Sequence, residues 1–175
     1  MSEINIVRLN DTPQIRAALS GMLIEVVANR GSVGFMHPLA PEDADGFWEA
    51  SLSAAAKAKR IILGAFEGKT LVAALTLLLD CPPNQPHRAE LAKMMTRKSY
   101  RGRGIARALA HEAERLAVAR GRTLLVLDTA VINGAAALYE RLGYSLTGII
   151  PDYALLPHGG LTGTMIYWKR IGGKG

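Results

Sequence analysis

The stretch RGRGIA, residues 101–106, joins a strand pattern at 89–96 to a helix pattern at 104–120. Glycines at such a junction let the backbone approach a ligand closely, and the first N–H groups of a helix have no partner within it. The helix dipole adds roughly half a positive charge at this end, and Arg101 and Arg103 can donate paired hydrogen bonds to an anion. The stretch is therefore typical of a pyrophosphate-binding loop, although an ordinary glycine-rich helix start would have the same composition.

The segments around this stretch alternate between strand and helix patterns. Residues 89–96 and 123–128 favour strands, and residues 104–120 and 133–142 favour helices. The run Leu124-Leu125-Val126-Leu127 is apolar throughout, as in a strand that is covered on both faces. A strand, a helix and a second strand in this order form a right-handed crossover, so we expect the two strands to be parallel.

The rest of the chain predicts two more helices and further strands. Asp11-Thr12-Pro13 is typical of a helix start, and Glu67-Gly68-Lys69 is typical of a hairpin turn. We expect strands over residues 4–9, 61–66, 70–79, 144–149 and 164–169, helices over 13–29 and 41–58, and loops over 30–40 and 81–88. The predicted fold class is therefore α/β, with a mixed, mostly antiparallel sheet that contains one βαβα unit.

Length and composition favour one folded domain over residues 1–175. Of the 175 residues, 49% are apolar and 21% are charged, which suits a chain with its own core. The single cysteine, Cys81, excludes an internal disulfide and a cysteine-rich zinc site. The start MSEINIVRLN has no apolar signal-peptide core, and the longest apolar stretch, residues 71–79, is about half of a membrane span. We predict a cytoplasmic protein with no membrane partner.

The net charge of +6 is concentrated in one part of the chain. Residues 93–122 contain nine basic residues against Glu112 and Glu114. Such an island predicts one anionic partner bound at one place, whereas a solvated helix face is the structural alternative. A nucleic-acid-binding module could use the same island, but the island lacks interleaved aromatic residues and a groove-reading motif. We therefore predict no nucleic-acid partner.

Two better-known phosphate-binding motifs do not fit the chain. The stretch GAFEGKT, residues 64–70, has three residues between its glycines where a P-loop requires four, and it lies in the expected hairpin. Gly102-Arg103-Gly104 begins a dinucleotide fingerprint, but Arg107 occupies the third glycine position. No metal is predicted, because metal-ligand spacing is absent from the four histidines, His37, His87, His111 and His158.

The pattern Arg101-x-x-Gly104-x-Ala106, preceded by the strand ELAKMMT at 90–96, resembles the acetyl-coenzyme A (acetyl-CoA) signature of the GNAT superfamily of N-acetyltransferases. The order of the expected elements matches that fold along nearly the whole chain. The segment LYERLGY at 138–144 is similar to the family's link between its last helix and the following strand. The resemblance implies a GNAT-type sheet, acetyl-CoA as cosubstrate, and direct attack of an amine on the thioester in a ternary complex. Because relatives are often dimers, a homodimer is expected by analogy.

A narrower resemblance within the superfamily, to the tabtoxin-resistance acetyltransferases, rests on residues at both ends and in the middle of the chain: 31–36, 88–90, 127–129, Pro151, Tyr153, Ile166, Tyr167 and Lys169. It implies that the acceptor is a small amino-acid-like amine, with a β-lactam toxin as one form and hence toxin or antibiotic resistance. Polyamines, aminoglycosides and peptide amines are alternative acceptors, and a non-catalytic acetyl-CoA sensor is an alternative function.

The resemblance also implies a set of cofactor-binding residues. Met94, Met95 and Thr96 would offer backbone groups to the pantetheine arm and the thioester oxygen. The pyrophosphate would be held by the loop Arg101, Gly102, Arg103, Gly104, Ile105 and Ala106. Asn133 lies one position after the asparagine that many relatives carry, so it either contacts the cofactor or only caps the following helix.

Three residues are candidates for the chemistry. Glu90 matches a position where several relatives carry a general base, and its alternative is a salt bridge to Arg88. Asp128 matches a second acidic position, where it acts in catalysis, binds the substrate's ammonium group or caps the next helix. Tyr139 matches a tyrosine near the sulfur that protonates the leaving thiolate, and packing on an apolar helix face is its alternative.

Substrate choice is expected to depend on two irregular segments that contain glycine and proline, residues 30–40 and 151–163. Both could border the thioester. Phe35 and Tyr153 are the candidate acceptor-binding residues in them, with core packing as the alternative.

Overall fold

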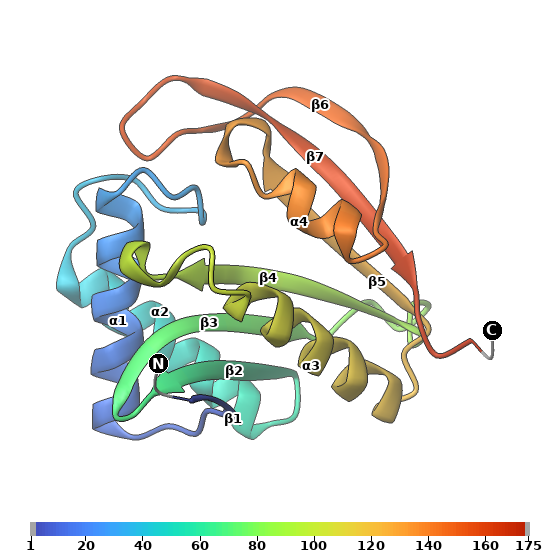
Figure 1. Cartoon of the computed structure of the whole chain (residues 1–175), viewed down its shortest axis with the longest axis horizontal. Helices are drawn as coiled ribbons and strands as arrows, with labels where there is room; N and C mark the ends of the chain where they lie inside the picture. The colour runs from blue at the N-terminus through green and yellow to red at the C-terminus, as the bar shows by residue number, and fades with distance from the viewer. Residues whose placement is uncertain (1–2, 174–175) are drawn as a thin grey trace.

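The computed structural model describes residues 3–173, apart from the side chain of Asn133, and shows a seven-stranded sheet with helices on both faces (Figure 1). The strands are β1 (Ile4–Arg8), β2 (Arg60–Glu67), β3 (Thr70–Leu78), β4 (Arg88–Thr96), β5 (Leu124–Ala130), β6 (Ser145–Leu155) and β7 (Leu161–Arg170). Their order in the sheet is β1-β2-β3-β4-β5-β7-β6. All neighbours are antiparallel except β4 and β5, which are parallel, so the predicted fold class is confirmed.

The helices are α1 (Pro13–Ala28), α2 (Pro41–Ala56), α3 (Ile105–Ala119) and α4 (Ala136–Arg141), with short 3-10 turns η1 (Lys98–Tyr100) and η2 (Val131–Asn133). Thr12 caps α1, because its hydroxyl accepts a hydrogen bond of 3.1 Å from the N–H of Ile15. The predicted helix over 133–142 was wrong at its start. Gly134, with φ of 66°, ends η2 before Ala135 caps α4.

Two apolar cores lie on opposite faces of the sheet. On one face, α3 and α4 cover the strands with residues such as Leu109, Leu116 and Tyr139. On the other face, α1 and α2 contribute Leu23 and Trp48, both fully buried. We call these faces the α3–α4 face and the α1–α2 face. Together they exclude water from most of β2 and β3, as these continuous apolar strands require.

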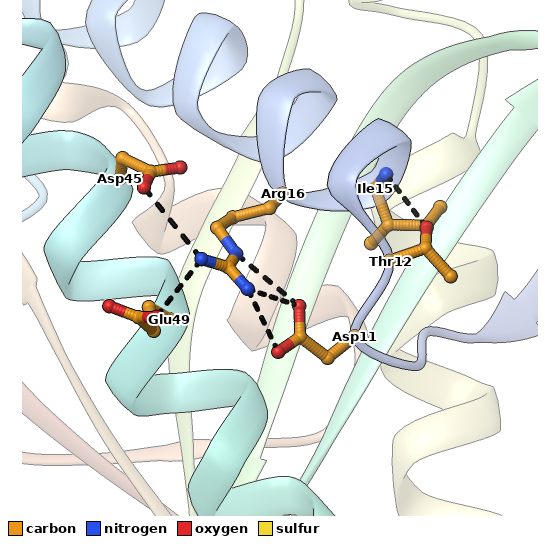
Figure 2. A network of polar contacts seen from close by, with 6 residues as sticks. All are labelled: Asp11, Thr12, Ile15, Arg16, Asp45 and Glu49. Atoms are coloured by element: carbon orange, nitrogen blue, oxygen red, sulfur yellow. Dashed lines mark hydrogen bonds and ion pairs between the residues drawn. The ribbon is translucent and has the colours of Figure 1, made fainter.

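A group of ion pairs holds α1 and α2 together at the surface (Figure 2). The Arg16 guanidinium donates to Asp11 just before α1 and to Glu49 on α2, at 3.1 Å in both cases, and Asp45 lies 3.9 Å away. Exposed pairs of this kind contribute only a few tenths of a kcal/mol to about 1 kcal/mol each. They join the start of α1 to α2, and the loop that connects these two helices borders the site described below.

The sheet divides between β4 and β5. The two strands pair only from Arg88 to Glu90 and from Leu124 to Val126, and beyond that point they diverge (Figure 1). We call β1–β4 with α1–α3 the N-terminal arm, and β5–β7 with α4 the C-terminal arm. Across the gap, the N–H of His37 donates to the carbonyl of Pro157 at 2.8 Å, and Lys169 pairs with Glu114.

The segment 151–163 differs from its expected irregular structure. Residues Pro151 to Leu155 continue β6, and β7 already begins at Leu161. The β6–β7 register shifts between Ile150 and Ala154, where Asp152 takes a positive φ of 50°. An edge strand tolerates a proline and such an irregularity, because one side of its backbone has no partner strand.

Candidate active site

The gap between the two arms is a cleft of about 950 Å³. It is lined by residues from β4, the start of α3, the end of β5, α4 and the β6–β7 hairpin. Among its described lining residues the acidic one is Asp128, whereas the basic ones are Arg30, Lys93, Arg101, Arg107 and Arg141. The excess of positive charge suits an anionic ligand.

The start of α3 forms an anion cradle at one end of the cleft. Gly102 and Gly104 both have φ of 76°, in the left-handed region that favours glycine, and a Cβ at either position would point into open space. Gly104 is the N-cap of α3 and offers no side-chain cap. The first N–H groups of the helix therefore remain available to a ligand. Arg101, Gly102, Gly104, Ile105 and Ala106 all line the cleft.

The side chain of Arg103 is directed elsewhere. It donates to the Glu67 carboxylate at 2.6 Å and lies 5.0 Å from the centre of the Tyr100 ring. This pairing holds the pKa of Glu67 below its usual range. Arg107, in the first turn of α3, lines the cleft instead. Arg107 therefore lies in the cleft lining, whereas Arg103, which was predicted to contact the cofactor, does not.

A β-bulge in β4 opens the strand toward the cleft. Thr76 of β3 pairs with Ala92 and Ala74 pairs with Met95, so β4 contains one extra residue in this interval. Lys93 takes the strained backbone conformation, with φ of 51°. The predicted residues Met94, Met95 and Thr96 follow directly and line the cleft. One edge of this segment still pairs with β3, but since β5 has diverged here, the main-chain groups on the other edge of β4 face the cleft rather than a partner strand.

The two predicted carboxylates occupy different positions. Asp128 lines the cleft, and its Oδ2 accepts a hydrogen bond of 3.2 Å from the Thr164 hydroxyl. Glu90 lies where the arms meet, opposite Val126 in the register, and its Oε2 is 3.3 Å from Arg88 Nη1. The ion pair considered as the alternative for Glu90 is therefore present, and Glu90 is outside the set of lining residues.

Tyr139 lies on α4, between the cleft and the core. It is only 5% exposed, and its ring packs against Tyr144 at 5.9 Å and Tyr167 at 6.1 Å between ring centres. It also lines the cleft, so both predicted roles, packing and access to a ligand, are compatible. Burial, and secondarily the negative charge of Asp128, raises the pKa of Tyr139 to about 12. The phenol therefore remains protonated near neutral pH.

Of the remaining predicted residues, Tyr153 lines the cleft and Phe35 does not. Tyr153 is 54% exposed and lines the cleft from β6. Phe35 packs edge-on against Phe47, with 5.2 Å between ring centres, and lies behind the lining residues. Asn133 ends η2, and its side chain lies outside the described residues. It does not cap α4, because that position belongs to Ala135.

Within 3–173, no group of three or more histidine, cysteine, aspartate or glutamate residues could hold a metal ion. Over the same residues, no helix has both the length and the apolar character needed to cross a bilayer.

Known structures share this architecture. A candidate acetyltransferase from Acinetobacter baylyi ADP1 is 18% identical with a TM-score of 0.83, covering 98% of this chain and 93% of its own. An N-acetyltransferase from Staphylococcus aureus Mu50 is 16% identical with a TM-score of 0.78, covering 95% and 98%. A candidate acetyltransferase from Salmonella typhimurium, solved with its cofactor acetyl-CoA, is 14% identical with a TM-score of 0.76, covering 95% and 93%. At these identities the comparison concerns the fold.

Sequence comparison identifies the family. The N-acetylaspartate synthetase of Danio rerio is 37% identical over 67 residues, which are 38% of this chain. The chain spans 24% of the length of that relative. The family model described as the acetyltransferase (GNAT) family matches residues 27–144, well over half of the chain. The chain belongs to the acetyltransferase (GNAT) family, as its glycine-rich stretch and strand order predicted.

Proposed function

We propose that this protein transfers an acetyl group from acetyl-CoA to the amine of a small amino-acid-like molecule, by direct attack in a ternary complex. The main support is that one cavity contains both an anion cradle and a pair of acid–base groups. The start of α3 lines one end, and Asp128 and Tyr139 line the wall formed by the C-terminal arm. A cofactor anchored at the cradle and extending along β4 would bring its acyl end to these groups.

The residues present fit acetyl-CoA. The glycines at 102 and 104 leave open space beside unpaired N–H groups, as a diphosphate requires. The main-chain groups of Met94, Met95 and Thr96 would hold the pantetheine, and Arg101 and Arg107 would add charge to the diphosphate site. When bound, the cofactor supplies a thioester whose carbonyl carbon accepts the amine and whose sulfur leaves as a thiolate.

The chain's own residues would move two protons. The attacking amine forms a C–N bond and loses a proton, and the C–S bond breaks to give a thiolate that gains one. We assign the first proton to a carboxylate, with Asp128 favoured because it lines the cleft, and Glu90 as the alternative acting through water. Tyr139 would donate the second, since its raised pKa keeps the phenol protonated.

Matched variants separate the two carboxylates. Asp128→Asn and Glu90→Gln both remove a charge without changing shape. Loss of a general base lowers kcat by about 10²- to 10⁴-fold. We expect that loss in Asp128→Asn, and only a few-fold loss in Glu90→Gln. The reverse ranking would transfer the role of base to Glu90.

An amino-acid-like acceptor is supported by the narrower sequence resemblance and by the name of the Danio rerio relative, which refers to an acetylated amino acid. The β-lactam amino-acid toxins are the first members of this class to try, because tabtoxin resistance is the finer form of the proposal. A carboxylate such as Asp128 beside the acyl site could also bind the ammonium group of such a molecule before its deprotonation.

The deciding experiment is release of free thiol from acetyl-CoA with a panel of acceptors: amino acids, β-lactam amino acids, polyamines, aminoglycosides and peptides. Selective release with either amino-acid class is the expected result, and release with the β-lactam class would support a resistance function. Release only with another class would refute the acceptor assignment but not the transfer. Tight acetyl-CoA binding without release would favour a sensor.

The proposal includes a cytoplasmic location and a homodimer. Cys81 is a free thiol, as is usual in a reducing compartment. Cell fractionation tests the location. Light scattering of the purified protein tests the dimer, and a mass of 18.8 kDa in solution would refute it.

A further inference from the structure

Lys93 presents a positive charge to the cleft in an unusual setting. It is half-buried at the bulge of β4, where its positive φ is a backbone conformation that disfavours a residue with a side chain. Its Nζ lies 5.7 Å from the centre of the Phe35 ring and 5.5 Å from that of Phe47. A Cβ on Gly34 would lie only 3.3 Å from the same nitrogen. The loop before α2 and two aromatic rings therefore hold this ammonium group in place.

Within the part of the chain that the structure describes, this ammonium group has no close counter-charge. Among residues 3–173, Lys93 takes part in none of the ion pairs shorter than 4.0 Å. Burial lowers its pKa, and the more distant charges of Asp128 and Glu90 oppose that shift. A partly desolvated cation facing a cleft is costly, and a bound anion in the cleft would offset the cost.

Lys93 and Asp128 point to the same face of the sheet. Leu125 and Leu127 pack into the core on the α3–α4 face, so Asp128, which alternates with them, points to the α1–α2 face. Phe35 and Phe47, the partners of Lys93, pack into the core on that α1–α2 face. Both charged groups line the cleft. The anion cradle of α3 lies on the opposite face, so this pair is separate from the diphosphate site.

We propose that Lys93 binds the carboxylate of the acceptor, so that the acceptor is a zwitterion held between Lys93 and Asp128 rather than a simple amine. This inference rests on the proposed acetyl transfer. An α-amino acid carries its amine and its carboxylate on one carbon, so a single small molecule can meet both groups. Phe35 thereby acts on acceptor choice indirectly, by positioning the lysine from behind the cleft wall.

The test compares acceptors that differ only in the carboxylate. The best amino acid of the panel is assayed beside its α-carboxamide, with wild type, Lys93→Met, Lys93→Arg and the control Lys98→Met. Lys98 is an exposed lysine of the same segment outside the cleft lining, so its loss controls for net charge. A hydrogen bond between charged groups contributes about 1.5–3 kcal/mol, and about 2 kcal/mol corresponds to about 30-fold.

We expect Lys93→Met to lower kcat/KM for the amino acid about 30-fold, mainly by raising KM, and to change kcat/KM for the carboxamide less than about 3-fold. Lys93→Arg should restore part of the loss, and Lys98→Met should behave as wild type. Unchanged CoA affinity in Lys93→Met confirms that the variant is folded and that the cofactor site is intact. Equal losses on both acceptors would overturn the proposal, as would a wild-type preference for the carboxamide.

A second readout separates failure of this inference from failure of the proposed function. Calorimetric titration of the amino acid into the protein saturated with CoA measures binding without chemistry. If no amine is acetylated, acetyl transfer is refuted, yet carboxylate binding that is lost in Lys93→Met would still support the role of Lys93. If acetylation of amino acids proceeds but Lys93→Met binds and turns over like wild type, the inference alone is wrong.

Discussion

Gly104 offers the sharpest test of the anion cradle, because the effect of its replacement on folding can be separated from the effect on the ligand. Gly104→Ala places a methyl group on a backbone with φ of 76°, and nothing lies within 4 Å of that methyl group. The left-handed conformation destabilises the folded protein by about 1–2 kcal/mol when the residue is alanine. Because alanine also lowers the conformational entropy of the unfolded chain, it offsets about 0.4–1 kcal/mol of that loss. The free energy of unfolding should therefore fall by only about 1 kcal/mol.

Gly121 provides the matched control at the other end of α3. It has φ of 71°, and its Cβ would also meet nothing within 4 Å. The 15 residues of α3 place it about 22 Å from the cradle. Gly121→Ala should thus lose the same stability, measured by urea unfolding, without touching the ligand.

Acetyl-CoA affinity should distinguish the two variants. The methyl group at position 104 occupies space beside the N–H groups of the cradle, and weakening two such hydrogen bonds to a charged group removes about 3 kcal/mol or more of binding energy. This corresponds to a Kd that is about 100-fold weaker by calorimetric titration. Gly121→Ala should bind as wild type does. Equal affinities in the two variants would refute the assignment of the cradle.

Three further changes test the chemistry and the packing. Tyr139→Phe keeps the ring contacts but should lower kcat about 100-fold or more. The pKa of Tyr139 is about 12 in the folded protein against 10 in the unfolded chain, so between pH 9 and 12 the free energy of unfolding of wild type should fall by about 2 kcal/mol more than that of the variant. Parallel stability curves of the two proteins over this pH range would contradict the prediction. Lys169→Met leaves the Glu114 carboxylate, 14% exposed, without its cation. This should lower the free energy of unfolding, measured in urea, by about 1–3 kcal/mol. The added change Glu114→Gln should restore most of that loss, and simple additivity of the two changes would exclude an interaction. Leu109→Ala, at a residue with no exposure on α3, should cost about 2–5 kcal/mol, and a loss below 1 kcal/mol would mean that the core collapses around the cavity.

The features that the sequence predicted well are those that depend on local chemistry. The glycines at 102 and 104 indicated the start of α3, and the apolar run from Leu124 to Leu127 indicated a strand covered on both faces and parallel to β4. Thr12 and Pro13 indicated the start of α1. In each case the residue that sets the conformation is part of the element itself.

The features that could not be predicted from the sequence depend on residues that lie far away along the chain. The charge of Lys93 reaches the cleft because β4 gains a residue relative to β3, and a shift of register between two strands has no local sequence signal. Arg103 leaves the cradle because Glu67, 36 residues earlier, lies within reach. Pro151 and the glycines up to Gly163 favoured an irregular segment, whereas pairing with β7 keeps β6 extended to Leu155.

The short ladder between β4 and β5 has a mechanical consequence. Three residue pairs carry the continuity of the whole sheet at this point, and a sheet resists bending less where fewer hydrogen bonds join its strands. A displacement of one arm relative to the other would therefore meet less resistance from this ladder than from the longer ladders within each arm, and domain motions of this kind take microseconds to milliseconds. A molecule that spans the cleft acts as a brace between the arms, and its departure restores the softer motion.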